Sequence, residues 1–185
     1  VHRKVTVGDD IGLLQVELAA MAAAADLVIV NGGLGPTVDD LTAEVLARVT
    51  GVGLEEHPAA LAHLQDWCGR RRLPLNAANL KQAMLPAGAA IVPNPIGSAV
   101  GFEMLVGNCR VICTAGVPGE LAAMLDGIVA DLARRLDRPL ERSILRLQTF
   151  GLGESTAQQM ISDGISDWPA EVAARGARFG AASWL

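Results

Sequence analysis

Apolar residues recur at two different spacings in the first part of the chain, and each spacing predicts one kind of element. Residues 11–22 place apolar side chains three and four apart, as in an amphipathic helix. Residues 26–31 are a continuous, largely apolar run, which is typical of a buried parallel strand. Glycines then interrupt the pattern, and helical spacing resumes over 39–49. The sequence therefore predicts a helix, a strand, a glycine loop and a second helix.

The same patterns predict further elements as far as residue 136. The alternation of helices and strands favours a three-layer α/β/α fold with a mostly parallel sheet. The predicted helices cover 58–71, 76–85 and a long segment from the loop at 115–119 to about 136. The predicted strands are a strand-like 4–7, a short strand at 90–92, and a hairpin of 102–106 and 110–114 around Gly107 and Asn108.

A break in the pattern follows residue 136 and suggests a second domain. Asp137–Pro139 reads as a linker, after which a strand is predicted over 143–150, a helix over 153–161 and a strand over 171–179. These elements look like the start of a small α+β module that is incomplete in this sequence. We therefore divide the chain into a first domain at 1–136 and a second at 137–185.

Composition excludes several classes of function. Aromatic residues make up 3% of the chain and the net charge is −5, which argues against a nucleic-acid-binding surface. The most apolar stretch, 19–30, is too short to span a bilayer. The cysteines Cys68, Cys109 and Cys113 are odd in number and form no CxxC pair, which fits a reducing, cytoplasmic compartment. Cys109 and Cys113 lie four apart on one predicted strand, so we expect them in the core.

The glycine loop at 32–40 is the strongest candidate for a binding site. Gly32, Gly33 and Gly35 have no Cβ, so the backbone can approach a ligand closely. The helix that follows offers free N–H groups, which favours phosphate binding. The loop lacks the Gly-Lys-Ser/Thr ending of a P-loop, and it lacks the third glycine of the dinucleotide fingerprint.

Oxygen-bearing side chains crowd the end of this loop. They are Thr37, Asp39, Asp40, Thr42 and Glu44. Two carboxylates would repel a phosphate unless a divalent cation bridged them, so we expect Mg²⁺ or a similar metal at Asp39 and Asp40. The simpler alternative is that Thr37 and Asp40 cap the helix while Asp39 interacts with its dipole. That alternative leaves the three glycines and the second aspartate unexplained.

Three other segments contribute candidate ligand-binding residues. Asn79 and Gln82 are three apart on a short predicted helix and can face one ligand, although exposed polar residues are the commoner case. The other candidates are Asn94, Gly97, Ser98 and Gly101 in a second loop, and Gly116, Pro118 and Glu120 in a third. The second loop is equally consistent with a simple turn, and the third with a simple helix start.

The residues of these segments match a known pattern. The stretch from Asp26 to Glu44 resembles the signature of the CinA family, the competence- and damage-inducible proteins built on a molybdopterin-binding-like domain of the MoaB/Mog type. Further segments agree in order. They are 7–10, 79–83, 93–102 and 116–120, together with 151–155, which resembles the entry to the family's small KH-like α+β domain.

The resemblance implies a specific chemistry. Asp40, Thr42 and Glu44 fall on the loop pattern of the molybdenum-cofactor proteins, and Asp40 matches a catalytic aspartate of their adenylylating members. The resemblance to CinA-like proteins implies metal-dependent hydrolysis of ADP-ribose to AMP and ribose 5-phosphate. Asp40 and Asp39 would then be the catalytic and metal-binding residues. One alternative is a non-catalytic module that binds a pterin or a nucleotide. Another is a structural domain that forms homo-oligomers through its alanine-rich helices.

The sequence departs from the family pattern at three loop positions. Ser98 stands where the family usually has Thr, Val100 where it has Pro, and Ala115 where it has Pro. These substitutions keep the loops but weaken the expectation of full activity. The family's opening strand and its Gly-Asp-Glu-Leu-Leu loop are expected to precede Val1.

Overall fold

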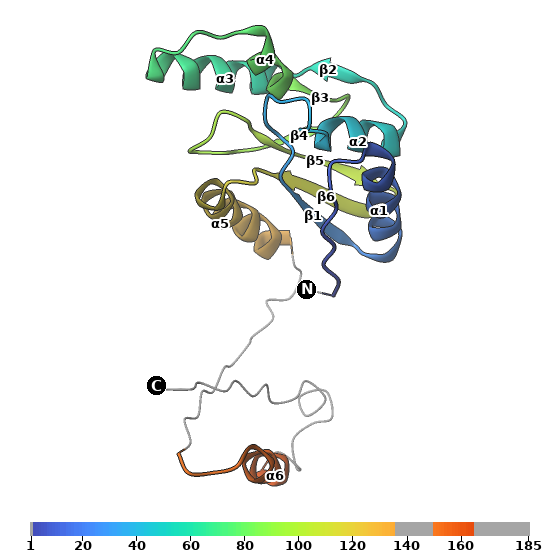
Figure 1. The fold of residues 1–185 in the computed structure, drawn as a ribbon, viewed down its shortest axis with the longest axis vertical. Coiled ribbons are helices and arrows are strands. Elements are labelled where there is room, and N and C mark those ends of the chain that lie inside the picture. Colours follow the sequence, from blue (N-terminus) through green and yellow to red (C-terminus); the bar gives the residue numbers. More distant parts are fainter. Residues whose placement is uncertain (1, 136–149, 165–185) are drawn as a thin grey trace. The chain divides into compact units, whose positions relative to one another are not determined.

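The structure is a computed structural model that describes residues 2–135 and 150–164 of the chain (Figure 1). The chain divides into two units, Val1–Pro139 and Leu140–Leu185. The described part of the second unit contains one helix, α6 (Glu154–Gly164), which confirms the helix predicted over 153–161. All the strands of the described residues belong to the first unit.

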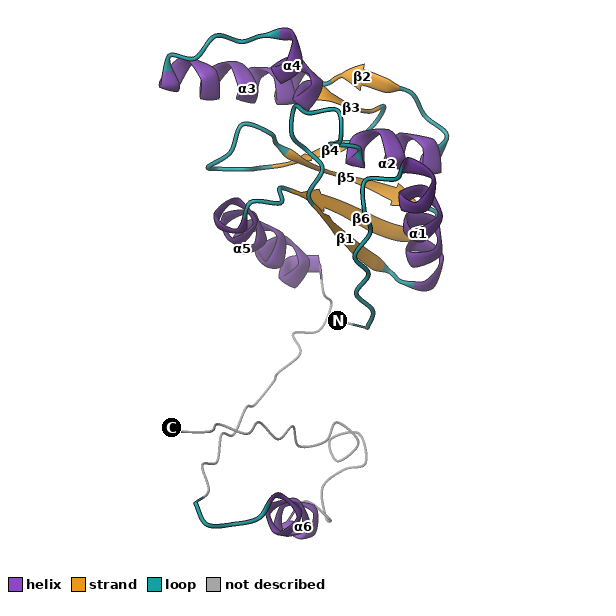
Figure 2. Cartoon of the chain, viewed as in Figure 1, coloured by secondary structure: helices purple, strands orange, loops and turns teal. Residues whose placement is uncertain are grey.

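The first unit is built on a four-stranded sheet with the order β1-β6-β5-β4. Its strands are β1 (Leu27–Asn31), β6 (Cys109–Thr114), β5 (Gly101–Val106) and β4 (Ala90–Val92). The predicted α/β class is confirmed. The sheet was expected to be mostly parallel, but it is mixed: β1 and β6 are parallel, while β6 with β5 and β5 with β4 are antiparallel (Figure 2).

A tight turn accounts for the antiparallel pairing of β5 with β6. Val106 pairs with Cys109, so only Gly107 and Asn108 connect the two strands. Gly107 has a φ of +60°, a left-handed conformation that glycine adopts without steric cost. The hairpin predicted at this position is therefore confirmed, and it reverses the chain direction inside the sheet.

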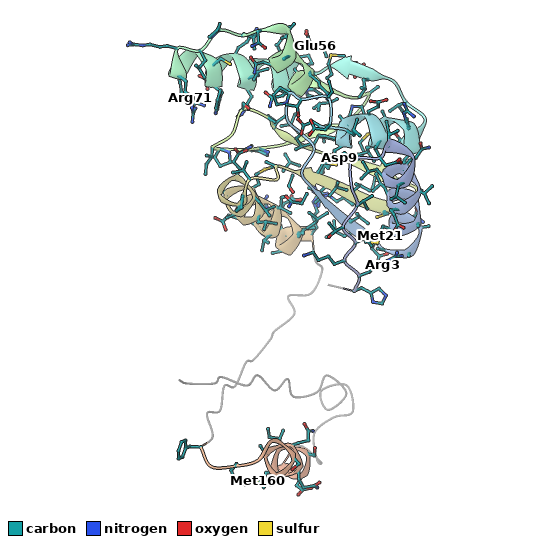
Figure 3. The ribbon with its side chains drawn as sticks, viewed as in Figure 1. Arg3, Asp9, Met21, Glu56, Arg71 and Met160 are labelled. Atoms are coloured by element: carbon teal, nitrogen blue, oxygen red, sulfur yellow. The ribbon has the colours of Figure 1, made fainter. Side chains whose placement is uncertain are left out.

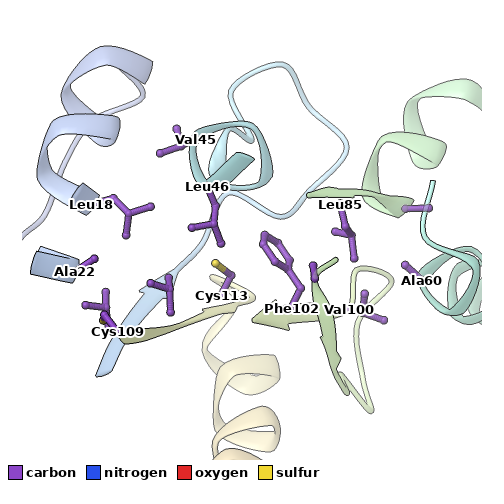
Figure 4. Close-up of a cluster of buried hydrophobic side chains, with 14 residues drawn as sticks. Leu18, Ala22, Val45, Leu46, Ala60, Leu85, Val100, Phe102, Cys109 and Cys113 are labelled. Carbon is purple, nitrogen blue, oxygen red and sulfur yellow. The ribbon is translucent and has the colours of Figure 1, made fainter. Parts of the chain in front are cut away.

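Helices cover both faces of this sheet. On one face α1 (Ile11–Ala24) and α2 (Thr42–Thr50) pack against the strands, with Leu18, Leu46 and Phe102 in one buried cluster (Figure 4). On the other face α5 (Pro118–Arg135) packs Met124 against Ile112. Side chains alternate along a strand, so Ile112 faces α5. The predicted three-layer arrangement is thus present.

Two cysteines on the same strand as Ile112 confirm a further prediction. Cys109 and Cys113 lie on the same strand and are both buried in the cluster of α1 and α2. Burial raises the pKa of both thiols, because a thiolate would lose its hydration there. The two cysteines therefore belong to the core, and both are poor nucleophiles.

A small second sheet packs against α2, and α3 (Pro58–Arg71) follows its first strand in the sequence. It pairs β2 (Leu54–Glu56) with β3 (Met84–Pro86) in antiparallel fashion. The helix predicted over 76–85 is wrong in extent, because this segment is divided into α4 (Ala77–Leu80), the 3₁₀ helix η1 (Lys81–Ala83) and β3. The chain leaves the helical conformation at Met84, because the backbone of β3 there pairs with β2.

Other predicted elements differ in where they begin or lie outside the described ranges. The helix α2 begins at Thr42, not at 39, so Asp39 and Asp40 belong to the preceding loop. The strand-like segment 4–7 is not a strand, since none of the described strands pairs with it. The linker at 137–139 and the strand predicted at 171–179 fall outside the described residues, as does the strand predicted at 143–150 except for Phe150. None of the described helices is long and apolar enough to cross a membrane.

Candidate functional site

The first and third loops meet where the parallel strands β1 and β6 end. The Gly32 N–H donates a hydrogen bond of 2.8 Å to the Thr114 carbonyl at the end of β6. A Cβ added to Gly116 would lie 3.2 Å from the Gly32 Cα, so the two glycines touch. Loops that follow parallel strands form the binding edge of an open α/β sheet, and this contact places both loops at that edge.

The glycine loop packs tightly on the first turn of α2. Gly33 has a φ of +68°, and a Cβ there would lie 2.4 Å from the Thr42 hydroxyl oxygen. That hydroxyl donates a hydrogen bond of 2.7 Å to the Gly32 carbonyl, and the Thr42 N–H donates one of 3.2 Å to the Gly33 carbonyl. The predicted ligand residue Thr42 therefore holds the loop closed, and Gly33 is required by this packing.

Asp40 is fixed in a turn within the same loop. Its Oδ2 accepts hydrogen bonds from the Thr37 N–H at 2.8 Å and from the Thr37 hydroxyl at 2.5 Å. The capping pair that was the simpler alternative thus exists, but it closes a turn and not a helix, because the N-cap of α2 is Leu41. A Cβ at Gly35 would lie 2.5 Å from Asp40 Oδ2, so Gly35 makes room for this carboxylate.

Asp39 and Lys81 add opposite charges beside Asp40. The Thr37 hydroxyl, a backbone N–H and the Lys81 ammonium lower the pKa of the exposed Asp39. The hydroxyl carries a single proton and bonds Asp40 at 2.5 Å, so we ascribe the lowered pKa of Asp39 mainly to the N–H and to Lys81. The Lys81 ammonium itself donates a hydrogen bond to the Thr37 carbonyl.

A cavity of about 60 Å³ lies against this loop. Its polar lining residues are Asp40, Glu44, Lys81 and Gln82, and its apolar lining includes Leu34, Val100 and Phe102. Ligand sites for whole small molecules usually measure about 300–1,000 Å³. A cavity of this size holds several waters or one small chemical group, and therefore a part of a nucleotide-sized ligand.

Gln82 is the most buried polar residue of this lining, with 7% of its surface exposed. Its Nε2 donates a hydrogen bond of 3.1 Å to the Ser98 hydroxyl of the second loop. Its Oε1 is buried and has no hydrogen-bond partner among the described residues. Asn79 was expected to face the same ligand, but its Oδ1 instead accepts a hydrogen bond from the Asn76 N–H in the capping box of α4.

The second loop is held together by Asn94, which is 1% exposed. The Asn94 Nδ2 donates hydrogen bonds of 2.8 Å to the Ala99 carbonyl and to Glu120 Oε2. Its Oδ1 accepts from the N–H groups of Ile96 and Gly97 at 3.2 and 2.9 Å. All the hydrogen-bonding capacity of this side chain is used inside the protein, which favours the interpretation of the loop as a turn.

The remaining candidates of the second and third loops also have packing roles. A Cβ at Gly97 would lie 1.9 Å from Glu120 Oε2, and one at Gly101 would lie 2.6 Å from the Cys113 carbonyl. Pro118 is the first residue of α5, with Glu120 in its first turn. The structure gives these residues structural contacts, and their predicted role in ligand binding stays a prediction.

The structure thus brings part of the predicted site together around one cavity. The predicted residues that line it are Gly33, Gly35, Asp40, Glu44 and Gln82. Figure 3 shows the side chains of the described residues on the ribbon. Sequence reasoning missed Lys81 as a site residue. The available signal was that Lys81 is one of only two lysines in the chain, next to the candidate Gln82.

The expected metal site rests on two carboxylates. Within 2–135 and 150–164, no group of three or more His, Cys, Asp or Glu side chains is arranged to hold a metal ion. Magnesium sites commonly use one or two carboxylates and complete the coordination with water and substrate phosphate oxygens. Asp39 and Asp40 fit a site of that kind.

Comparison with known proteins adds an independent line of information. Residues 1–135 match the family model described as a probable molybdopterin binding domain. The chain is 49% identical over 173 residues to a CinA-like protein of Colwellia psychrerythraea, covering 93% of the chain and 40% of that protein. It is 46% identical over 158 residues to a CinA-like protein of Geobacter sulfurreducens, covering 84% of the chain and 38% of that protein. The chain therefore spans about two fifths of the length of these relatives.

A solved structure agrees with these matches. The crystal structure of a CinA protein of unknown function from Thermoplasma acidophilum is 35% identical in sequence and superposes with a TM-score of 0.62. The match covers 67% of this chain and 73% of that one.

Proposed function

The chain belongs to the molybdopterin binding domain family and is CinA-like, and we propose that it is a metal-dependent hydrolase that cleaves ADP-ribose to AMP and ribose 5-phosphate. One observation carries the proposal. Asp40 lines the cavity in a conformation fixed by two hydrogen bonds from Thr37. A carboxylate held in one position beside a glycine loop is suited to bind a metal–diphosphate group.

The donor set of this site fits a hard divalent metal such as Mg²⁺. The carboxylate oxygens of Asp39 and Asp40 would hold it. When bound, the metal would neutralise the diphosphate charge and make a bound water more acidic. The chain itself supplies the fixed carboxylate, the orienting Thr37 and the nearby ammonium of Lys81.

The decisive experiment replaces Asp40 by Asn in the full-length protein that contains this chain. We expect Asp40→Asn to lower metal-dependent release of AMP from ADP-ribose by roughly 100-fold or more, because a fixed anionic group at the reacting site is lost. Asp66→Asn is the matched control, because Asp66 is an exposed carboxylate that pairs with Arg70 on α3, far along the chain from the loop. AMP is measured chromatographically with several divalent metals.

Two results would contradict the proposal. One is the absence of AMP release by the unsubstituted protein with every metal tested. The other is equal activity of Asp40→Asn and Asp66→Asn, which would place the chemistry elsewhere.

A second candidate function is a non-catalytic module that binds molybdopterin or a nucleotide. The small volume of the cavity, about 60 Å³, favours it, because a site that takes only part of a ligand can bind without enclosing the reacting bond. Calorimetry with molybdopterin, AMP and ADP-ribose, run beside the turnover assay, separates binding from hydrolysis. A purely structural, oligomer-forming domain would show no ligand-induced rise in melting temperature.

A further inference from the structure

The helix η1 places two consecutive side chains, Lys81 and Gln82, in the lining of the cavity. Among the described residues, the Lys81 ammonium bonds a neutral carbonyl and the Gln82 Oε1 accepts no hydrogen bond. We propose that Lys81 binds the phosphate oxygens of a sugar phosphate and that Gln82 accepts a hydrogen bond from a sugar hydroxyl beside that phosphate. The inference rests on the ligand class of the proposed function, and it assigns the sugar-phosphate end of the ligand to this cavity. It does not depend on turnover.

The ammonium of Lys81 forms no ion pair with the residues that the structure describes, although its charge acts on Asp39. Its hydrogen-bond partner is the carbonyl of Thr37, a neutral group. Lys81 takes part in none of the ion pairs of the described residues, whereas Glu44, another residue of the cavity lining, is paired with Arg48 at 2.7 Å. A lysine that lines a cavity and bonds only a carbonyl can exchange that partner for a phosphate oxygen, which binds an ammonium more strongly.

This charge changes the role expected of the metal. The carboxylates of Asp39 and Asp40 repel a phosphate. From the sequence alone, we expected a bridging divalent cation to offset that repulsion. Lys81 lines the same cavity as Asp40 and offsets part of this repulsion. Lys81 therefore strengthens phosphate binding without a metal, and the metal serves the cleavage step of the proposed function.

The amide of Gln82 has an unused acceptor. Gln82 is 7% exposed, its Nε2 is bonded to Ser98, and its buried Oε1 has no partner in the part of the chain that the structure describes. A buried acceptor without a donor costs free energy, so such groups are rare unless a ligand or an ordered water supplies the donor. A rotation of this side chain toward the cavity would allow a hydroxyl group to supply it.

The size and lining of the cavity favour a small sugar phosphate over a whole nucleotide. About 60 Å³ accommodates a phosphate and a neighbouring hydroxyl, but not a nucleotide. The apolar residues Leu34 and Leu54 also line the cavity and are not buried in the core, so they can pack against the carbon atoms of a sugar. A phosphorylated sugar such as ribose 5-phosphate combines an anion, a hydroxyl and a carbon face in a small volume.

The first test measures ribose 5-phosphate binding by calorimetry in the full-length protein, with EDTA present to remove divalent metals. Lys81→Met should weaken binding at least about tenfold, the loss expected for one charge-assisted contact. Lys4→Met is the matched control, because Lys4 is the only other lysine and is exposed. Equal affinities of the two variants, or no binding of ribose 5-phosphate by the unsubstituted protein, would overturn the inference.

The second test separates a binding role of Gln82 from a structural one. Gln82→Met should weaken ribose 5-phosphate binding severalfold with little change in the urea midpoint, because removing a buried unpartnered acceptor offsets the loss of the Nε2 hydrogen bond to Ser98. Gln65→Met on the exposed surface of α3 is the control. A lower midpoint with unchanged affinity would mean that Gln82 only supports the fold, and the inference would fail.

A measurement without any substitution guards against variants that do not fold. Amine-reactive labelling followed by mass spectrometry should show Lys81, but not Lys4, protected by ribose 5-phosphate. Protection without any ADP-ribose cleavage would refute the proposed hydrolase while supporting this site. Cleavage of ADP-ribose without protection of Lys81 would leave the hydrolase standing and reject this site.

Discussion

The first loop, 32–40, and the second loop, 94–101, are built from similar residues but use them in opposite ways. Both are rich in glycine and in small polar side chains. In the second loop, the donors and acceptors of Asn94 are all bonded to other protein groups. In the first loop, the carboxylate of Asp39 is exposed and Asp40 lines the cavity.

Two loops of similar composition can therefore have different roles, one structural and one in ligand binding. A loop whose polar groups satisfy one another is a structural connection, and its substitution affects the stability of the fold. A loop that leaves charged groups at a cavity retains capacity for a ligand, and its substitution affects binding or turnover. Three variants test this division.

Asn94→Ala should have the largest effect on stability. The substitution removes the partners of two backbone N–H groups, one carbonyl and the Glu120 carboxylate, and buried groups left unpaired typically cost about 2–4 kcal/mol in total. Urea unfolding measures the loss. Asn76→Ala, which removes only an exposed helix cap, should cost about 1 kcal/mol. If Asn94→Ala costs no more than this control, the second loop is not the structural connection described above.

Gly35→Ala should have an intermediate effect, on activity more than on stability. The new Cβ would lie 2.5 Å from Asp40 Oδ2 and must displace that carboxylate. We expect AMP release to fall roughly 10–100-fold, as for other small misplacements of reacting groups, with a stability change within about 1 kcal/mol. Gly53→Ala is the control, because a Cβ there would meet no atom within 4 Å. Full activity of Gly35→Ala would show that the position of Asp40 is not critical.

Asp39→Asn should have the smallest effect on stability. The pKa of Asp39 is lowered in the folded protein, so its ionised form favours folding above the unfolded pKa of 3.8. That contribution is lost as the pH falls through the lower, folded pKa. The variant should therefore unfold at a slightly lower urea concentration at pH 7, and the difference should shrink as the pH falls below 3.8 and through the folded pKa. A difference that grows toward acidic pH would contradict the assigned direction.

Much of the fold follows from local patterns in the sequence. The helices α1 and α3 occur where apolar spacing placed them, because one face of each is buried. The strand β1 occurs at the apolar run and is parallel to β6, but it is less buried than predicted, because it lies at the edge of the sheet and Ile29 is 44% exposed. The strands β2 and β3 could not be predicted in this way. Each has three residues, all three of β2 are exposed, and they form because they pair with each other across a long stretch of chain.

The sequence predicted the loop beside which the candidate cavity lies, but it did not predict the contacts that its residues make. From the sequence, we expected the glycines of this loop to let a ligand approach the backbone closely. In the structure, Gly33 and Gly35 instead make room for the side chains of Thr42 and Asp40. Lys81 was missed because its role depends on contact with Thr37, which lies 44 positions away in the sequence. Long-range contacts of this kind have no periodic signature.

The burial of the cysteines has a practical consequence for following this loop in solution. Cys68, Cys109 and Cys113 are the only thiols of the chain, and all three are buried. Thiol-reactive dyes should therefore label the native chain slowly. A cysteine introduced at Val38, which is 92% exposed at the tip of the glycine loop, would then carry a fluorophore selectively. Its emission would report ligand arrival at the loop in real time.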